Sequence, residues 1–165
     1  SPVAGGPSAG QRLDRDVLSL SGVTTVIWLE GINDFNSGVN ASVDTVSSAM
    51  RAIVARLRER VPGITVVGAT VISALHSTNA VHGSAEEDEK RRALNTFIRT
   101  SGVFDAVADF DAVTLDPATG ELKAMFVPES TTGGAGDKLH PNRAGYMAMA
   151  QAIDLAKLGL GAPER

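Results

Sequence analysis

An aspartate and a histidine lie three residues apart near the end of this sequence. Asp137 and His140 belong to the stretch Asp-Lys-Leu-His-Pro-Asn. At this spacing a carboxylate can bind one ring nitrogen of the histidine, fix its tautomer and stabilise the imidazolium that forms when the other nitrogen accepts a proton. The spacing therefore predicts a general-base pair. The alternative is an ordinary surface pair, which an Asp near a His in a loop often forms.

A second polar segment, residues 30–36, directly follows an apolar run at residues 23–29. Within it, the side chain of Asn33 is of chemical interest. A carboxamide donates two N–H bonds and cannot be deprotonated, which suits a fixed donor aimed at a developing oxyanion. Asn and Asp also form turns through bonds to their own backbone, so a purely local role for Asn33 and Asp34 stays open.

A serine near the start, Ser8, fits the G-x-S-x-G pattern of a nucleophile elbow. The order Ser8, Asp137, His140 is also the order of the α/β-hydrolase triad. An elbow needs a preceding strand, however, and residues 1–5 are few and rich in Gly and Pro. Ser8 followed three residues later by Gln11 predicts a helical capping box instead. Ser8 is therefore a candidate nucleophile with a structural alternative.

The elements that must position these residues alternate along the chain. Apolar, β-branched runs predict buried strands over residues 23–29, 64–72 and 103–110. Apolar residues at helical spacing predict helices over residues 9–20, 43–61, 84–102 and 142–157. This alternation predicts one α/β domain over residues 1–165, with a parallel sheet covered by helices on both faces. Ligands of such sheets bind beyond the carboxyl ends of the strands, where segment 30–36 lies.

Together, Gly31-x-Asn33-Asp34 after a strand and Asp137-x-x-His140-Pro141 before the last helix resemble the third and fifth sequence blocks of the SGNH/GDSL hydrolases. Further similar stretches cover residues 12–18, 104–107, 109–111 and 142–146. The resemblance implies a three-layer α/β/α flavodoxin-like fold and an esterase or lipase that acts through an acyl-serine. It implies Asn33 as an oxyanion-hole donor, His140 as the base and Asp137 as its orienting carboxylate. No cofactor or metal is implied.

The sequence also departs from that family. The first block, a Gly-Asp-Ser stretch that supplies the nucleophile, is absent, and the glycine of the second block is not recognisable. We therefore expect an N-terminally truncated domain that lacks the first two strands and keeps three. A catalytically inactive fragment or binding module is the alternative function. Loss of the first strand would leave residues 23–29 as an apolar sheet edge, which predicts a homo-oligomer.

The composition of the chain excludes several classes of function. The chain has 165 residues, of which 43% are hydrophobic and 21% charged, as in ordinary globular proteins. A net charge of -4 lacks the basic excess that nucleic-acid binding needs. No apolar run is long enough to span a membrane, so we expect a soluble protein. The family resemblance implies a small-molecule ester as its partner. The absence of cysteine excludes disulfides and thiolate nucleophiles, but it leaves the compartment open.

Two other motifs do not fit a specific site. The spacing of His76 and His82 matches no standard zinc pattern, which favours a solvated loop. The glycine-rich stretch at 133–138 fails the P-loop pattern, because Asp137 separates its last glycine from Lys138. A nucleotide-binding doubly wound domain is therefore a third hypothesis, supported by topology alone.

Overall fold

A computed structural model describes the fold over residues 6–159. Its sheet has three parallel strands in the order β1-β2-β3. The strands are β1 Thr25–Trp28, β2 Thr65–Ala69 and β3 Ala106–Ala108. In the register, Gly68 of β2 lies between Trp28 of β1 and Val107 of β3. The predicted parallel α/β arrangement with three strands is confirmed.

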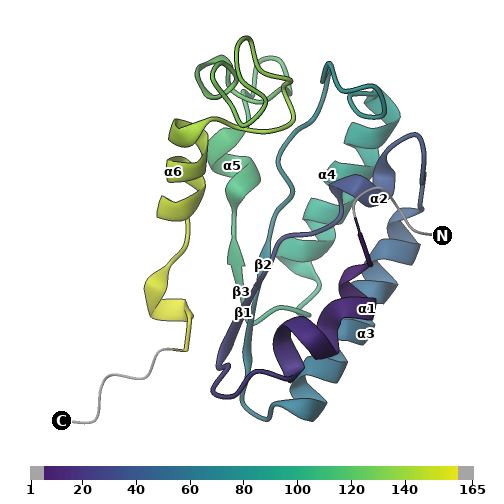
Figure 1. The fold of residues 1–165 in the computed structure, drawn as a ribbon, viewed down its shortest axis with the longest axis vertical. Coiled ribbons are helices and arrows are strands. Elements are labelled where there is room, and N and C mark those ends of the chain that lie inside the picture. Colours follow the sequence, from purple (N-terminus) through teal and green to yellow (C-terminus); the bar gives the residue numbers. More distant parts are fainter. Residues whose placement is uncertain (1–5, 160–165) are drawn as a thin grey trace.

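Helices cover both faces of this sheet. The α-helices are α1 Ala9–Leu13, α2 Ile32–Phe35, α3 Val43–Arg60, α4 Ala85–Thr100, α5 Phe110–Thr114 and α6 Arg143–Gln151. Shorter turns are the π-helical η1 Asp14–Leu18 and the 3₁₀-helices η2 Ala124–Phe126 and η3 Leu155–Lys157. Figure 1 shows α1, α3 and α4 on one side of the sheet and α5 and α6 on the other, which gives three layers. Within residues 6–159, no helix is long and apolar enough to cross a membrane.

Each face of the sheet has its own hydrophobic core. The larger core packs Trp28 of β1 against helices α1, α3 and α4, and in it Leu57 and Leu94 are fully buried. The smaller core joins Val67 of β2 to Met149 of α6. Full burial of one such aliphatic side chain contributes about 1.5–3 kcal/mol. The larger core therefore supplies most of the burial that holds the layers together.

Several predicted elements are shorter than the sequence pattern indicated. Strands β1 and β2 are shorter than the apolar runs at 23–29 and 64–72, and two further elements end early. The strand expected over 103–110 is only three residues long, because the Asp109 side chain accepts the Ala112 N–H and begins helix α5 at Phe110. The helix expected over 142–157 ends at Gln151. After it, Asp154 takes an extended conformation and caps η3. In both places an aspartate starts a new helical turn and interrupts the apolar pattern.

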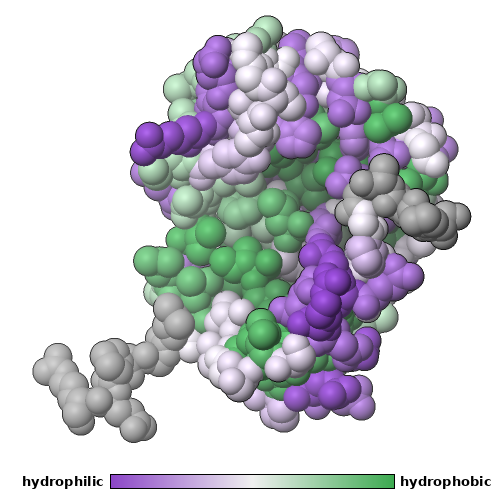
Figure 2. Space-filling view, viewed as in Figure 1, coloured by the Kyte–Doolittle hydropathy of each residue, from purple (hydrophilic) through white to green (hydrophobic). Residues whose placement is uncertain are grey.

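The edge of the sheet at β1 has no neighbouring strand among the described residues. Trp28 faces the larger core, whereas the flanking Ile27 and Leu29 are 41% and 42% exposed. Figure 2 shows apolar side chains gathered in the middle of the visible face. A groove of about 230 Å³ runs between this strand and the α1–η1 segment. The apolar edge expected at residues 23–29 is therefore present.

Candidate active site

The segments that carry Asn33 and the Asp137–His140 pair are both joined to the loop after β2, beyond the carboxyl ends of the strands. The loop after β2 contacts both of the other segments. The Ser37 N–H, beyond α2, donates to the Val81 carbonyl at 2.9 Å. The Thr78 N–H donates to the Asp137 carbonyl at 3.1 Å. Three regions far apart in the sequence thus form one edge, where a site of this fold class is expected.

Asp137 and His140 form the pair that their spacing predicts. The Nδ1 atom of His140 lies 2.7 Å from Oδ2 of Asp137. The other carboxylate oxygen accepts the backbone N–H groups of Leu139 at 3.0 Å and His140 at 2.9 Å. The His140 side chain is 45% exposed, and its Nε2 has no hydrogen-bond partner among residues 6–159. One imidazole nitrogen is therefore oriented by Asp137, and the other is free to accept a proton.

The Asp137 carboxyl is held in its charged form. Burial alone would raise the pKa of Asp137. The hydrogen bonds from the backbone and ring of His140 and from the Leu139 N–H outweigh burial, so the pKa lies below its ordinary value. A carboxylate that stays ionised near neutral pH suits the stabilisation of an imidazolium.

The chain on both sides of this pair is fixed by its own sequence. Gly136 has a φ of +74°, and a Cβ there would lie 2.0 Å from the Val127 carbonyl oxygen. On the other side, the Asn142 side chain caps α6 by accepting the Ala144 and Gly145 N–H groups. Its amide group donates to the carbonyls of Met125 in η2 and of Pro128. The Asp137–His140 pair therefore lies between a tight glycine turn and a capped helix.

Asn33 lies on the short helix α2, immediately beyond β1. Gly31 precedes this helix with a φ of +130°, and a Cβ at Gly31 would lie 2.7 Å from the Leu94 side chain. The Asn33 side chain is exposed, and its carboxamide makes no hydrogen bond within the described residues. It is therefore available as a donor, although no hydrogen bond connects it to His140.

Ser8 begins α1 and forms the predicted capping box. Its hydroxyl accepts the Gln11 N–H at 3.4 Å, and its own N–H donates to the Gln11 side chain at 3.0 Å. No hydrogen bond connects Ser8 to His140 in the part of the chain described here. Residues 1–5, which would have to supply the strand of a nucleophile elbow, lie outside the described residues.

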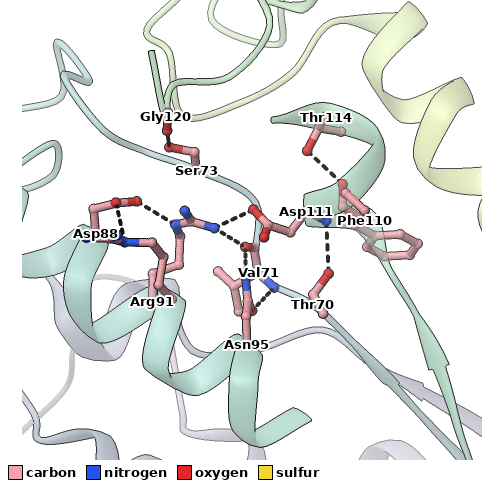
Figure 3. A network of polar contacts seen from close by, with 12 residues as sticks. Thr70, Val71, Ser73, Asp88, Arg91, Asn95, Phe110, Asp111, Thr114 and Gly120 are labelled. Atoms are coloured by element: carbon pink, nitrogen blue, oxygen red, sulfur yellow. Dashed lines mark hydrogen bonds and ion pairs between the residues drawn. The ribbon is translucent and has the colours of Figure 1, made fainter. Parts of the chain in front are cut away.

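The sequence reasoning missed a buried ionic network that joins α4, α5 and the start of the loop after β2 (Figure 3). The Arg91 side chain of α4 is 1% exposed and pairs with both Asp88 and Asp111. It also donates to the Val71 carbonyl at 3.0 Å, and Asn95 binds both the N–H and the carbonyl of Val71. The network ties the start of the loop after β2, and helix α5, to α4. A signal was present, because these polar residues recur at helical spacing beside the apolar residues of α4.

Solved structures share this fold. A GDSL-like lipase from Bacteroides thetaiotaomicron superposes with a TM-score of 0.71 at 18% identity, over 88% of this chain and 67% of that one. A protein from Bacteroides fragilis, provisionally named an acylhydrolase, gives a TM-score of 0.67 at 19% identity, over 88% of this chain and 66% of that one. The chain thus spans about two thirds of the length of these structures. At this level of identity they show the fold alone.

Sequence comparison identifies the family. No curated protein matches the chain. The sequence model of the GDSL-like lipase/acylhydrolase family, however, matches residues 3–148. This range includes Ser8, Asn33, Asp137 and His140. A match over most of the chain, together with the parallel sheet and the α/β/α layers, places this protein in the GDSL-like lipase/acylhydrolase family of hydrolases.

Proposed function

We propose that this chain hydrolyses carboxylic esters of small molecules, with His140 as general base and Asp137 as the carboxylate that orients it. The observation that carries the proposal is the hydrogen bond between His140 Nδ1 and an ionised Asp137, on a half-exposed ring whose Nε2 has no partner among residues 6–159. Membership of a lipase and acylhydrolase family supports an acyl substrate. General-base catalysis by such a group contributes typically 10²–10⁴-fold in rate.

Asn33 is the proposed oxyanion donor. When a nucleophile attacks an ester carbonyl, the carbonyl oxygen becomes negative and needs fixed N–H donors. The carboxamide of Asn33 is exposed at the carboxyl edge of the sheet and makes no internal hydrogen bond in the described chain. Loss of one such donor costs on the order of 10²–10³-fold in kcat.

Ser8 is the proposed nucleophile. Its Oγ would attack the ester carbonyl carbon while His140 takes the hydroxyl proton. His140 would then return that proton to the departing alkoxide, and water would release the acid from the acyl-serine. In the structure this hydroxyl binds within the cap of α1, so attack requires it to leave the Gln11 N–H. The proposal therefore needs a test that separates the cap from the chemistry.

That test compares hydrolysis of a short-chain p-nitrophenyl ester by the wild type and by His140→Ala, Ser8→Asn and Ser8→Ala. Asn caps a helix about as well as Ser but offers no hydroxyl, whereas Ala removes both the cap and the nucleophile. We expect His140→Ala and both Ser8 variants to lose activity at least about 100-fold. Circular dichroism confirms that each variant is folded.

Each outcome assigns a role. Activity that survives in Ser8→Asn and is lost in His140→Ala would rule out Ser8 as the nucleophile and support His140 as the general base. A folded wild type with no hydrolysis, and no labelling by a serine-directed phosphonate, would overturn ester hydrolysis. It would favour the alternative of a non-catalytic binding module.

We also propose that the β1 edge pairs with a second copy of the chain. The strand lacks a neighbour in the described residues and exposes Ile27 and Leu29 beside a groove. The Trp28 Nε1–H, buried at this strand, has no hydrogen-bond partner in the same range. An unprotected apolar edge of this kind recruits another strand. A mass that rises with protein concentration supports the pairing, and a constant monomer mass would contradict it.

A further inference from the structure

The main-chain carbonyl of Asp137 accepts two hydrogen bonds from the loop after β2. The Ser77 hydroxyl donates to it at 2.7 Å, and the Thr78 N–H donates at 3.1 Å. The same residue binds His140 through its carboxylate. Asp137 is thus held at its backbone by one loop while its side chain orients the candidate base.

The Ser77 hydroxyl is itself held in place. The Ser77 N–H donates to the Ala74 carbonyl at 2.9 Å, and the hydroxyl oxygen accepts the Asn79 N–H at 3.1 Å. Gly83 packs directly on Ser77 with a φ of +102°, and a Cβ on Gly83 would lie 2.6 Å from the Ser77 nitrogen. The hydroxyl has one proton to donate, and it donates that proton to the Asp137 carbonyl.

The far end of the loop is anchored to α4 and to the segment that carries Asn33. The Glu87 carboxylate accepts the Gly83 N–H at 2.7 Å and pairs with Nδ1 of His82. The His82 and Glu87 side chains are only 4% and 3% exposed, so the solvated position predicted for His82 is wrong, because Glu87 binds its ring in the interior. The Val81 carbonyl receives the Ser37 N–H, as described above. The loop thus connects Asp137 to a rigid helix and to the region of the proposed oxyanion donor.

We propose that Ser77 is a positioning residue for the Asp137–His140 pair. Its hydroxyl sets the orientation of the Asp137 backbone, and with it the direction of the carboxylate that accepts the Leu139 and His140 N–H groups. A small misplacement of such a group is costly, because general-base catalysis depends on hydrogen-bond geometry. The effect on catalysis rests on the ester hydrolysis proposed above, whereas the effect on the carboxylate does not.

Ser73 provides a matched control in the same loop. Its hydroxyl also donates to a backbone carbonyl at 2.7 Å and accepts an N–H two residues ahead at 3.1 Å. The carbonyl that it binds belongs to Gly120 instead of Asp137, as Figure 3 shows. Ser73→Ala therefore removes the same kind of bond without touching the candidate base pair.

The experiment compares Ser77→Ala, Ser77→Thr and Ser73→Ala in the full chain. The first readout is the NMR titration of the Asp137 carboxyl carbon. In Ser77→Ala we expect its midpoint to rise by about half a unit or more, because the bonds that favour the charged carboxylate are weakened. Threonine keeps the hydroxyl and restores the wild-type midpoint, and Ser73→Ala leaves it unchanged.

The second readout is p-nitrophenyl ester hydrolysis. We expect Ser77→Ala to lower kcat about tenfold with little change in KM, a loss of the size of one hydrogen bond, and Ser77→Thr to recover most of it. The Thr78 N–H still satisfies the Asp137 carbonyl in Ser77→Ala, which favours folding of the variant.

The two readouts distinguish failure of the proposed function from failure of the positioning role. If the wild type does not hydrolyse the ester, the proposed function fails, and the Asp137 titration still decides whether Ser77 orients the carboxylate. An unchanged Asp137 midpoint in Ser77→Ala overturns the positioning role, even where hydrolysis is present. Equal shifts in Ser77→Ala and Ser73→Ala overturn it as well, because they would mark a general loosening of the loop.

Discussion

At the scale of single residues, the candidate base pair depends on backbone conformations that few residues adopt. Gly136 and Lys138 flank Asp137 with φ values of +74° and +58°. Between them the chain turns tightly enough for the Asp137 carboxylate to reach both the Leu139 and the His140 N–H groups. A non-glycine residue in this left-handed backbone conformation costs roughly 1–2 kcal/mol. The local sequence therefore accepts strain at Lys138 and places glycine where no side chain fits.

Gly136→Ala should disrupt this turn. A Cβ at Gly136 would lie 2.0 Å from the Val127 carbonyl oxygen, so the backbone must move in addition to bearing the left-handed penalty. We expect the free energy of unfolding to fall by about 3 kcal/mol or more, the range of severe backbone strain. Urea denaturation measures the loss, and hydrolysis of a p-nitrophenyl ester should fall with it.

Gly133→Ala is the matched control in the same loop. Gly133 has the same φ of +74°, but a Cβ there would meet no atom within 4 Å. In this variant the free energy of unfolding should fall only by the conformational penalty, roughly 1–2 kcal/mol. Equal losses in the two variants would contradict the role assigned to the Val127 contact.

At the scale of elements, the long helices could be predicted because their signals are local. Helices α3 and α4 show apolar spacing, and each begins at a serine, Ser42 or Ser84, whose hydroxyl accepts an N–H of the first turn. The four-residue helix α2 was not predicted, because so short a segment shows no periodicity. The ends of β3 and α6 were missed because Asp109 and Asp154 start new turns inside apolar runs.

The site could be predicted only where its partners are near in sequence. Asp137 and His140 are three residues apart, and their bond follows from that spacing. The bond from Ser77 to Asp137 joins residues 60 positions apart, and the Arg91–Asp111 pair joins residues 20 apart. Such contacts are set by how the loops fold over the sheet, for which a single sequence carries no local signal.

Asp109 links helices α4 and α5, and it should make the stability of the folded protein depend on pH. Its carboxylate accepts two bonds from Arg99 of α4, at 2.7 and 2.9 Å, and caps α5. The Arg99 hydrogen bond is the main reason that the pKa of Asp109 lies below its ordinary value, with a smaller contribution from Thr70. The folded state then binds fewer protons than the unfolded state as acid is added. The stabilisation by the charged Asp109 carboxylate is fully present above the pKa of an unfolded aspartate, about 3.9. It is lost as the pH falls through the lower pKa of Asp109 in the folded state.

Asp109→Asn tests this link. We expect the variant to be less stable than the wild type at pH 7, because the charged bonds to Arg99 are lost. Its melting temperature should also fall less than that of the wild type between pH 5 and pH 3. Thermal unfolding followed by circular dichroism gives both values. Parallel pH profiles for the two proteins would show that Asp109 does not carry the dependence.

At the scale of the whole molecule, the two faces of the sheet are covered unequally. Helices α1, α3 and α4 close one face around a large core, whereas α5 and α6 cover only part of the other (Figure 1). Trp28 of β1 points into the large core, and Ile27 and Leu29 alternate with it toward the other side, where they stay exposed. The exposed pair marks an uncovered face beside the end strand of the sheet, whose outer edge has no neighbouring strand among the described residues, and we propose that a second copy pairs there.

Ile27→Lys should prevent this pairing. A lysine on the exposed face of an edge strand stays solvated in the monomer, but in a sheet shared by two copies the lysines of both β1 strands would lie on one face and repel each other. We expect the wild-type mass in sedimentation velocity to rise toward a dimer with concentration, while Ile27→Lys stays monomeric with a near-wild-type melting temperature. Leu20→Lys is the control, because Leu20 is 57% exposed and lies outside β1. If Leu20→Lys also abolishes association, the surface involved is not the β1 edge, and the strand pairing proposed here is wrong.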